Sequence, residues 1–362
     1  MSSSPQRRIY LKEGENVLLQ KKNLWFLVGL TALYLLLFGT TALTAEPEGY
    51  SGLEGHPSLS QDDQTLVFSY FHNGDASLYK AGLDGKAEII AEPEEGYSYI
   101  RPTFAPDGKT IAFIQSWDVE ETPYQQLMLY KNGQVEPLLD QDRFVTEAVF
   151  SPDGTYLYYL QSDVYRNYSD IAQERPHDFD VYRMNIETEK VDQITNEQGY
   201  DFSSLHVWPD GNISYRTFEG ESFGGRDVLK IVNPETKESK TVTPEQGGAL
   251  SADQPPIFSS PTPSPSGEKV AFSDVGSLSS KGTYQYEIFF MDPDGTNVEQ
   301  VTNFHEYAGN PVFFHNDDRL LVSIDWNFAG GEPDYEYWII NGDDRKEWVM
   351  KLPEKSEGDE EN

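Results

Sequence analysis

The chain has 362 residues, of which 37 % are hydrophobic, and it contains no cysteine. This length and composition suit one large folded domain or two small ones, and they exclude a disordered or collagen-like chain. Without cysteine, disulfides, thiol nucleophiles, cysteine-ligated zinc and iron–sulfur clusters are excluded. The 61 acidic and 27 basic side chains give a formal charge of −34. Nucleic acid is therefore not expected as a partner, because a phosphate-binding surface would oppose the field of the whole protein.

An apolar segment, LWFLVGLTALYLLLFGTTALTA, extends over residues 24–45 and contains no charged side chain. At about 1.5 Å of rise per residue, a helix of this length spans the roughly 30 Å hydrocarbon core of a bilayer. Cleavage after Ala45 is the alternative, but Leu43 is larger than the residue that a signal peptidase prefers at that position. The sequence therefore predicts an uncleaved transmembrane signal anchor.

The charges that flank this segment predict its orientation. Glu46 and Glu48 follow it, and the residues that precede it include Arg7, Arg8, Lys12, Lys21 and Lys22. The positive-inside rule then places residues 1–23 in the cytoplasm and the remainder outside the cell membrane, extracellular or periplasmic. Residues 46–362 hold 22 basic and 59 acidic side chains, a charge of −37, so the acidity belongs to the exported part.

Six copies of one local pattern follow in the exported part. Each copy has a short apolar strand, a turn of Asp-Gly type and a second apolar strand, as in PTFAPDGKTIAF at residues 102–113. The turn position recurs every 45 to 57 residues, at Asp62, Asp107, Asp153, Asp210, Ser266 and Asn316. Asp-Gly and Asn-Gly pairs supply the positive φ that tight hairpins need. A second polar turn in each copy separates a third strand from a fourth.

Four antiparallel strands repeated six times predict an all-β fold, a six-bladed β-propeller. We expect the propeller to occupy residues 56–352, with residues 46–55 as a linker and residues 353–362 as an acidic disordered tail. The last blade is expected to end with an outermost strand at Glu347–Leu352. The ring is then expected to close by packing between the first and last blades, not by a strand shared between them.

Three of the repeats carry a family resemblance. They are Pro106–Phe113 (PDGKTIAF), Ser151–Gly154 (SPDG) and Met291–Asn297 (MDPDGTN). These segments resemble the repeat of TolB-type (WD40-like) β-propellers, which implies the fold of the whole exported domain. The resemblance implies less about function, since such blades occur in binding proteins, in prolyl oligopeptidase-like peptidases and in oligogalacturonate lyases. The chain has no room for the α/β domain that precedes the blades in TolB, so it resembles a membrane-anchored relative.

The repeat register also predicts a candidate site. The first strand of each propeller blade lines the central channel, and residues at its start surround one mouth of that channel. In this chain the polar residues at that register are His56, Arg101, Glu147, Ser204, Ser260 and Asn310. They predict a ligand-binding pocket, although any wet channel mouth tolerates polar residues. Arg101 is expected either to bind a carboxylate of the ligand or to pair with Glu147.

Three connections carry aromatic side chains and exceed the usual hairpin length. They are Ser116–Gln125, Asp163–Asp180 and Asp325–Tyr335. The first two contain Trp117, Tyr124 and Phe179, and the third contains Trp326 and Phe328. Such aromatics either bind a partner or pack on the scaffold, and we expect them to pack on it.

The chemistry-bearing residues favour a non-enzymatic binding or scaffold module for a protein or cell-envelope ligand. The six predicted blades occupy the chain beyond the apolar segment, so no separate hydrolase domain is expected, and the six histidines include no pair at i, i+4. No catalytic residue, metal ligand or cofactor is therefore predicted. The alternative is a propeller enzyme, a lyase or hydrolase that uses the polar residues at the channel mouth.

Overall fold

The computed structural model describes residues 49–120, 122–140, 143–167, 174–220, 225–250, 255–278 and 282–351. These residues form strands and turns, and no helix occurs among them, so none of them forms a helix that could cross a membrane. The fold is all-β, as predicted. The expected transmembrane segment at residues 24–45, the preceding basic segment and the acidic tail at 353–362 lie outside the described residues.

Two sheets begin the fold. The first contains β1 (Gly52–Leu53), β2 (Ser58–Leu59), β3 (Thr65–His72), β4 (Asp75–Gly82) and β5 (Ala87–Ala91). Both β1 and β2 pair with β3, and the order across the sheet is β1-β3-β4-β5. The second, in the order β6-β7-β8-β9, contains β6 (Tyr97–Phe104), β7 (Ile111–Val119), β8 (Thr122–Lys131) and β9 (Gln134–Pro137).

The next two sheets repeat the second sheet's order. One contains β10 (Phe144–Phe150), β11 (Tyr156–Asn167), β12 (Glu174–Asn185) and β13 (Val191–Gln193). The other contains β14 (Ser203–Val207), β15 (Ile213–Glu219), β16 (Arg226–Val232) and β17 (Ser239–Val242). Each strand is antiparallel to its neighbour, which is the hairpin sequence that the repeats predict.

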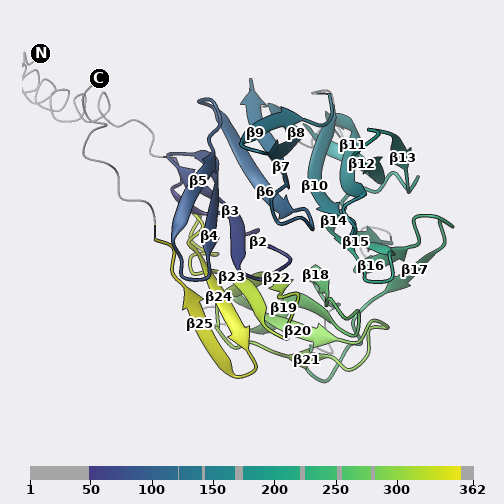
Figure 1. The fold of residues 1–362 in the computed structure, drawn as a ribbon. Coiled ribbons are helices and arrows are strands. Elements are labelled where there is room, and N and C mark those ends of the chain that lie inside the picture. Colours follow the sequence, from purple (N-terminus) through teal and green to yellow (C-terminus); the bar gives the residue numbers. More distant parts are fainter. Residues whose placement is uncertain are drawn as a thin grey trace, which may run out of the picture. The chain divides into compact units, whose positions relative to one another are not determined.

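The remaining strands form one continuous sheet with two halves. The first half contains β18 (Ser259–Pro263), β19 (Val270–Leu278), β20 (Tyr284–Met291) and β21 (Glu299–Gln300). The second contains β22 (Tyr307–Phe313), β23 (Leu320–Asp325), β24 (Tyr335–Asn341) and β25 (Asp344–Trp348). The halves meet at one parallel pair, Tyr286 opposite Tyr307. Figure 1 shows all the sheets arranged around a common centre, which is the architecture of a β-propeller.

Turn chemistry explains the repeated Asp-Gly positions. In the turn between β6 and β7, the Asp107 carboxylate accepts hydrogen bonds from the backbone N–H of Lys109 and of Thr110, both at 2.8 Å. Gly108 has φ +65°, a left-handed conformation that costs glycine little. This turn is therefore built by its own residues, as the sequence pattern indicated.

Two of the three expected long loops are instead extended hairpins. Most of Ser116–Gln125 belongs to β7 and β8, and most of Asp163–Asp180 belongs to β11 and β12. Trp117 lies opposite Tyr124, and their rings stack with centroids 5.5 Å apart. The loop interpretation was wrong. The charged residues at these hairpin ends resemble the composition of loops, but cross-strand aromatic pairs stabilise the segments as strands. Asp325–Tyr335 does connect β23 to β24 as a loop.

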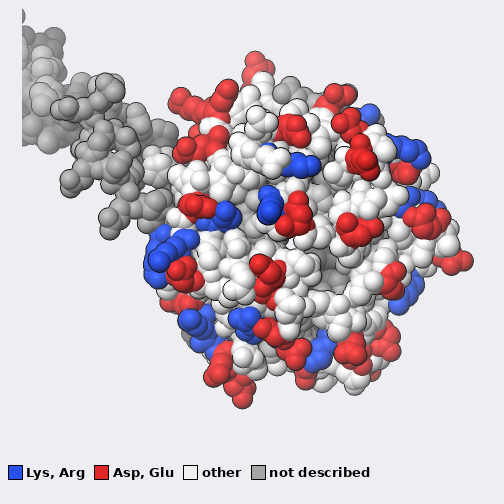
Figure 2. All heavy atoms as spheres, viewed as in Figure 1, with Lys and Arg blue, Asp and Glu red and all other residues white. Residues whose placement is uncertain are grey.

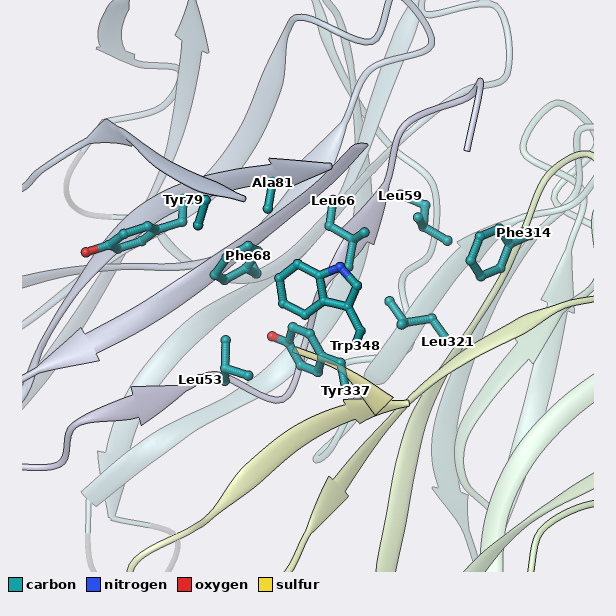
Figure 3. Packing of buried hydrophobic residues seen from close by; sticks show 11 residues of the cluster. Leu53, Leu59, Leu66, Phe68, Tyr79, Ala81, Phe314, Leu321, Tyr337 and Trp348 are labelled. Carbon is teal, nitrogen blue, oxygen red and sulfur yellow. The ribbon is translucent and has the colours of Figure 1, made fainter. Parts of the chain in front are cut away.

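Aromatic side chains fill the seam between the first and last sheets, and Figure 3 shows their packing. The Trp348 indole packs against the rings of Phe68 and Tyr337, with centroid separations of 5.4 and 5.8 Å, and these two rings also contact each other at 6.1 Å. Trp348 is 3 % exposed, and its indole N–H donates to the carbonyl of Gly82 at 3.2 Å. These side chains belong to one buried cluster, so the two ends of the propeller share a hydrophobic core.

Backbone and carboxylate hydrogen bonds complete the same seam. Lys351 N–H donates to the Gly85 carbonyl at 2.8 Å, and Ala87 N–H donates to the Lys351 carbonyl at 3.0 Å. On the described residues, the last strand pairs within its own sheet, at β24, so the ring closes by packing as predicted. Two boundaries differ from expectation: β25 ends at Trp348, and β1 already pairs with β3 within the stretch expected as a linker.

Asp63 is the polar centre of this seam. It is 2 % exposed, and its carboxylate accepts hydrogen bonds from the backbone N–H of His315 at 2.8 Å and of Asn316 at 2.9 Å. The Asn316 amide and the His315 ring also contact it, each at 2.9 Å. Burial raises the pKa of Asp63, but the hydrogen bonds from His315 and Asn316 outweigh burial and lower this pKa below its ordinary value.

We expect Asp63→Asn to lower the free energy of unfolding by about 1–3 kcal/mol at neutral pH, because charge-assisted hydrogen bonds across the seam are weakened. Folding lowers the pKa of Asp63, so its contribution is present above the unfolded value of about 4 and is lost as the pH falls through the folded value. The difference between wild type and variant, measured by denaturant unfolding, should therefore shrink below about pH 4.

The matched control is Asp62→Asn, one residue earlier, where the carboxylate is exposed. Its effect should stay within about 0.5 kcal/mol. Equal losses from the two variants, or a loss at Asp63 that does not change as the pH falls toward acid unfolding, would contradict the assignment of Asp63 to the seam.

Candidate functional site

Five of the six predicted ring residues lie inside the innermost strands, at a repeated β-bulge, whereas His56 lies between β1 and β2. In β6, β10, β14, β18 and β22 the register with the next strand shifts near this position. Four of the ring residues have a left-handed backbone, with φ of 51° at Arg101, 56° at Ser204, 50° at Ser260 and 48° at Asn310. A bulge leaves one residue out of the ladder and redirects its side chain. The common register predicted from the repeats therefore corresponds to a common backbone feature.

Arg101 and Glu147 connect three neighbouring sheets. An Arg101 guanidinium nitrogen, Nη1, lies 2.6 Å from Glu147 Oε1, which confirms the predicted alternative that these residues pair. The second oxygen of Glu147 accepts the backbone N–H of Leu205 at 2.9 Å. In the first sheet, Glu54 Oε2 accepts the backbone N–H of Arg101 at 3.0 Å. Two carboxylates, Glu54 and Glu147, thus join the first four sheets around the centre.

Other side chains continue these contacts around the centre. Ser260 donates to Asn310 Oδ1 at 2.8 Å, and the His206 ring lies 3.3 Å from the Thr262 hydroxyl. Ser323 donates to the carbonyl of Gly55 at 2.6 Å, which links the last sheet to the first. Ser204 lies at the bulge of β14 and takes no part in these contacts among the described residues.

Two groups near the ring, His206 and Glu54, have shifted pKa values. Burial of His206 lowers its pKa to about 4, and the nearby charge of Glu147 opposes this shift only in part, so His206 is neutral at pH 7. Burial raises the pKa of Glu54, but its hydrogen bond to His56 and the backbone N–H of Arg101 outweigh burial and lower this pKa. Glu54 is therefore an ionised acceptor, and His56 Nδ1 lies 3.3 Å from it.

Beside the ring, a cavity of about 370 Å³ opens between the β10–β13 and β14–β17 sheets. It reaches the ring at Arg101, Thr146 and Glu147. Its other lining residues are Arg175, Pro176, Phe179, Tyr200, Asp201, Phe202 and Ser203. The remaining predicted ring residues, His56, Ser204, Ser260 and Asn310, do not line this cavity. The predicted site thus has two parts. One is a belt of contacts that join neighbouring inner strands, and the other is a cavity beside this belt.

The cavity has cationic, anionic and aromatic walls. Phe179 and Phe202 are buried, whereas Tyr200 is 44 % exposed. The Arg175 guanidinium carbon lies 5.8 Å from the centre of the Tyr200 ring, within the range of a cation–π contact. Figure 2 shows carboxylates spread over the face in view with fewer basic side chains among them. Two arginines, Arg101 and Arg175, thus line one cavity in a domain of negative charge.

Sequence reasoning missed Arg175, Tyr200 and Phe202 as site residues. The hairpin that holds Arg175 was singled out for its length and its aromatic content, and Phe179 was named within it. The repeat register could not identify Arg175, Tyr200 and Phe202, because the cavity forms where the first residues of β12 pack against the segment before β14. Among the described residues, no group of three or more histidine, aspartate or glutamate side chains is placed to hold a metal ion.

Comparisons with known proteins agree with the fold. No family model matches the chain, and no curated protein matches it in sequence. Among solved structures, it is similar to TolB from Acinetobacter baumannii, at 19% identity and TM-score 0.49, over 84% of this chain and 64% of that one. The chain thus spans less than two thirds of that TolB.

Two further structures show the same fold at higher structural similarity. The β-propeller domain of the Trilobed protease from Pyrococcus furiosus, described as having an open velcro topology, matches at 13% identity and TM-score 0.51, over 83% of this chain and 84% of that one. An oligogalacturonate lyase in complex with manganese matches at 13% identity and TM-score 0.54, over 82% and 76%. The chain therefore has the β-propeller fold of these two proteins.

Removal of the Arg101 side chain tests how much its ion pair with Glu147 contributes to the stability of the propeller. The side chains of Arg101 and Glu147 are 32% and 17% exposed, so the pair is only partly screened by solvent. We expect Arg101→Ala to lower the free energy of unfolding by about 1–2 kcal/mol, roughly 2–5 °C in melting temperature. Arg345→Ala, at an exposed arginine over Phe304, is the control and should stay within about 0.5 kcal/mol. Identical melting curves for both variants would show that the ion pair contributes nothing to the ring.

Proposed function

We propose that this protein is a single-pass membrane protein whose exported six-bladed β-propeller binds a protein or cell-envelope ligand without converting it. The apolar segment 24–45 and its basic flank support the anchor and the orientation. The six sequence repeats support the blade count, as does the single parallel pair that divides the strands β18–β25 into two groups of four.

The cavity beside the ring is the observation that carries the binding function. It is concave, it combines buried aromatic walls with two arginines, and it is formed by β10, β12 and the segment before β14. Most ring carboxylates around it are engaged in holding neighbouring strands together. An arrangement of this kind orients a ligand and offers few groups that are free to move protons.

One contact favours the enzyme as a second candidate. His56 Nδ1 lies 3.3 Å from the ionised Glu54, and the His56 side chain is 41% exposed. A carboxylate that orients an accessible imidazole is a possible general base. Binding remains the better supported function, because Glu54 is also fixed by Arg101 and the described residues place no nucleophile or metal site beside the pair.

The orientation can be tested with intact cells whose wall has been removed. External protease should degrade residues beyond about 46 and leave an N-terminal epitope tag protected, because the basic flank keeps that end in the cytoplasm. Full protection of the chain until the membrane is permeabilised would contradict the proposed orientation.

Binding can be tested with the full chain in detergent micelles, immobilised and exposed to membrane and wall fractions. Recovery of the bound component should fall at least tenfold with Arg175→Ala and remain unchanged with Arg345→Ala, because only the first arginine lines the cavity. Equal recovery with both variants would place ligand binding elsewhere. Recovery of the ligand in an altered chemical form from wild type, but not from His56→Ala, would support the enzyme instead.

A further inference from the structure

The polar groups of the cavity wall differ in whether they are already bonded. Glu147 accepts hydrogen bonds from Arg101 and from the backbone of Leu205. Asp201 and Ser203 both contact Nη1 of Arg216, at 3.3 Å. Each of these groups is already oriented by a protein contact, so they shape the wall of the cavity.

Arg175 is different, because its guanidinium is exposed and no carboxylate of the described residues lies within ion-pair distance of it. Its position is nevertheless well defined. The backbone of Arg175 lies opposite Arg166 in the antiparallel β11–β12 ladder, and its guanidinium lies over the ring of Tyr200. Among the described residues, the cavity therefore presents one guanidinium that no carboxylate pairs, placed where its hydrogen-bonding fork can meet an anion.

The rest of the lining is mostly apolar, with the hydroxyl groups of Thr146 and Tyr200 beside it. Phe179 and Phe202 are 5% and 4% exposed and line the cavity, and the Phe202 ring stacks on Tyr215 with centroids 4.3 Å apart. The innermost strands β10 and β14 each pair on one edge only among the described residues. On their other edges the Leu205 N–H already donates to Glu147 and the Thr146 carbonyl accepts from Arg101, and the remaining main-chain groups can be offered to an extended peptide, as in strand addition.

We propose that this cavity binds the C-terminal end of a peptide or protein, with the terminal carboxylate on Arg175 and an apolar last side chain against Phe179 and Phe202. The assignment rests on the proposed binding function and specifies its ligand class. A cation, an apolar wall and a free strand edge match the carboxylate, side chain and backbone of one terminal residue.

The same inventory disfavours two other carboxylates. An acidic sugar carries hydroxyl groups that each need a partner when buried, and Glu147, Asp201 and Ser203 are already engaged. A fatty acid would satisfy Arg175 and the apolar wall, but it would leave the strand edges unused. Both serve as comparison ligands in the test.

The test uses the full chain in detergent micelles and isothermal titration calorimetry. The probes are the tetrapeptides acetyl-Gly-Gly-Leu-Phe and acetyl-Gly-Gly-Leu-Asp-amide, the first as free acid and as C-terminal amide, together with galacturonate and a short-chain fatty acid. The free acid of the Phe peptide should bind, and its amide should bind at least tenfold more weakly. Arg175→Ala should lose the same factor, whereas Arg345→Ala should not.

The outcomes separate this proposal from the general function. Binding of amide and free acid with equal affinity, or preferential binding of galacturonate, the fatty acid or the Asp peptide, would overturn the terminal-carboxylate assignment. No binding of any probe, while capture from envelope fractions still depends on Arg175, would overturn it too and leave the binding function standing. Loss of that capture dependence would instead remove the proposed site itself.

Discussion

The propeller depends on closing a ring between chain segments that lie more than 250 residues apart. Asp63 and His315, separated by 252 positions, are joined through the buried carboxylate of Asp63. Trp348 completes an aromatic cluster whose other members include Phe68 from the first sheet. Each radial sheet packs against two neighbours, so a gap at this seam would expose the flank of two sheets at once. Hydrophobic packing supplies the contact area, and Asp63 specifies how the two edges align.

The centre of the ring is held by a different device. At each bulge the inner strand leaves its ladder, and side chains such as Glu147 and Ser260 then bond to the neighbouring strand. Polar residues at a channel mouth thus have a structural use that needs no ligand. The binding proposal rests on what this belt leaves over, which is a cavity on one side and an arginine, Arg175, with no carboxylate of the described residues beside it.

Much of the fold could be predicted from sequence because its turns are encoded locally. Asp107 and Gly108 form their turn with contacts to residues at most three positions away. The common register of Arg101, Ser204 and Asn310 followed from the same periodicity, and the structure gives it a common bulge. The cavity could not be predicted this way, because Phe179 and Phe202 meet there through packing between two sheets. Cross-strand pairing likewise converted two expected loops into hairpins.

The seam also has a consequence for the order in which the chain can become stable. Leu66 and Phe68 of the first sheet are fully buried only against partners such as Leu321 and Trp348, which are synthesised last. Contacts of such high sequence separation form slowly, and the partners are absent while the chain is still being made. A chain interrupted before Trp348 would keep an apolar flank open, so quality-control proteases and chaperones should act on late truncations almost as strongly as on early ones.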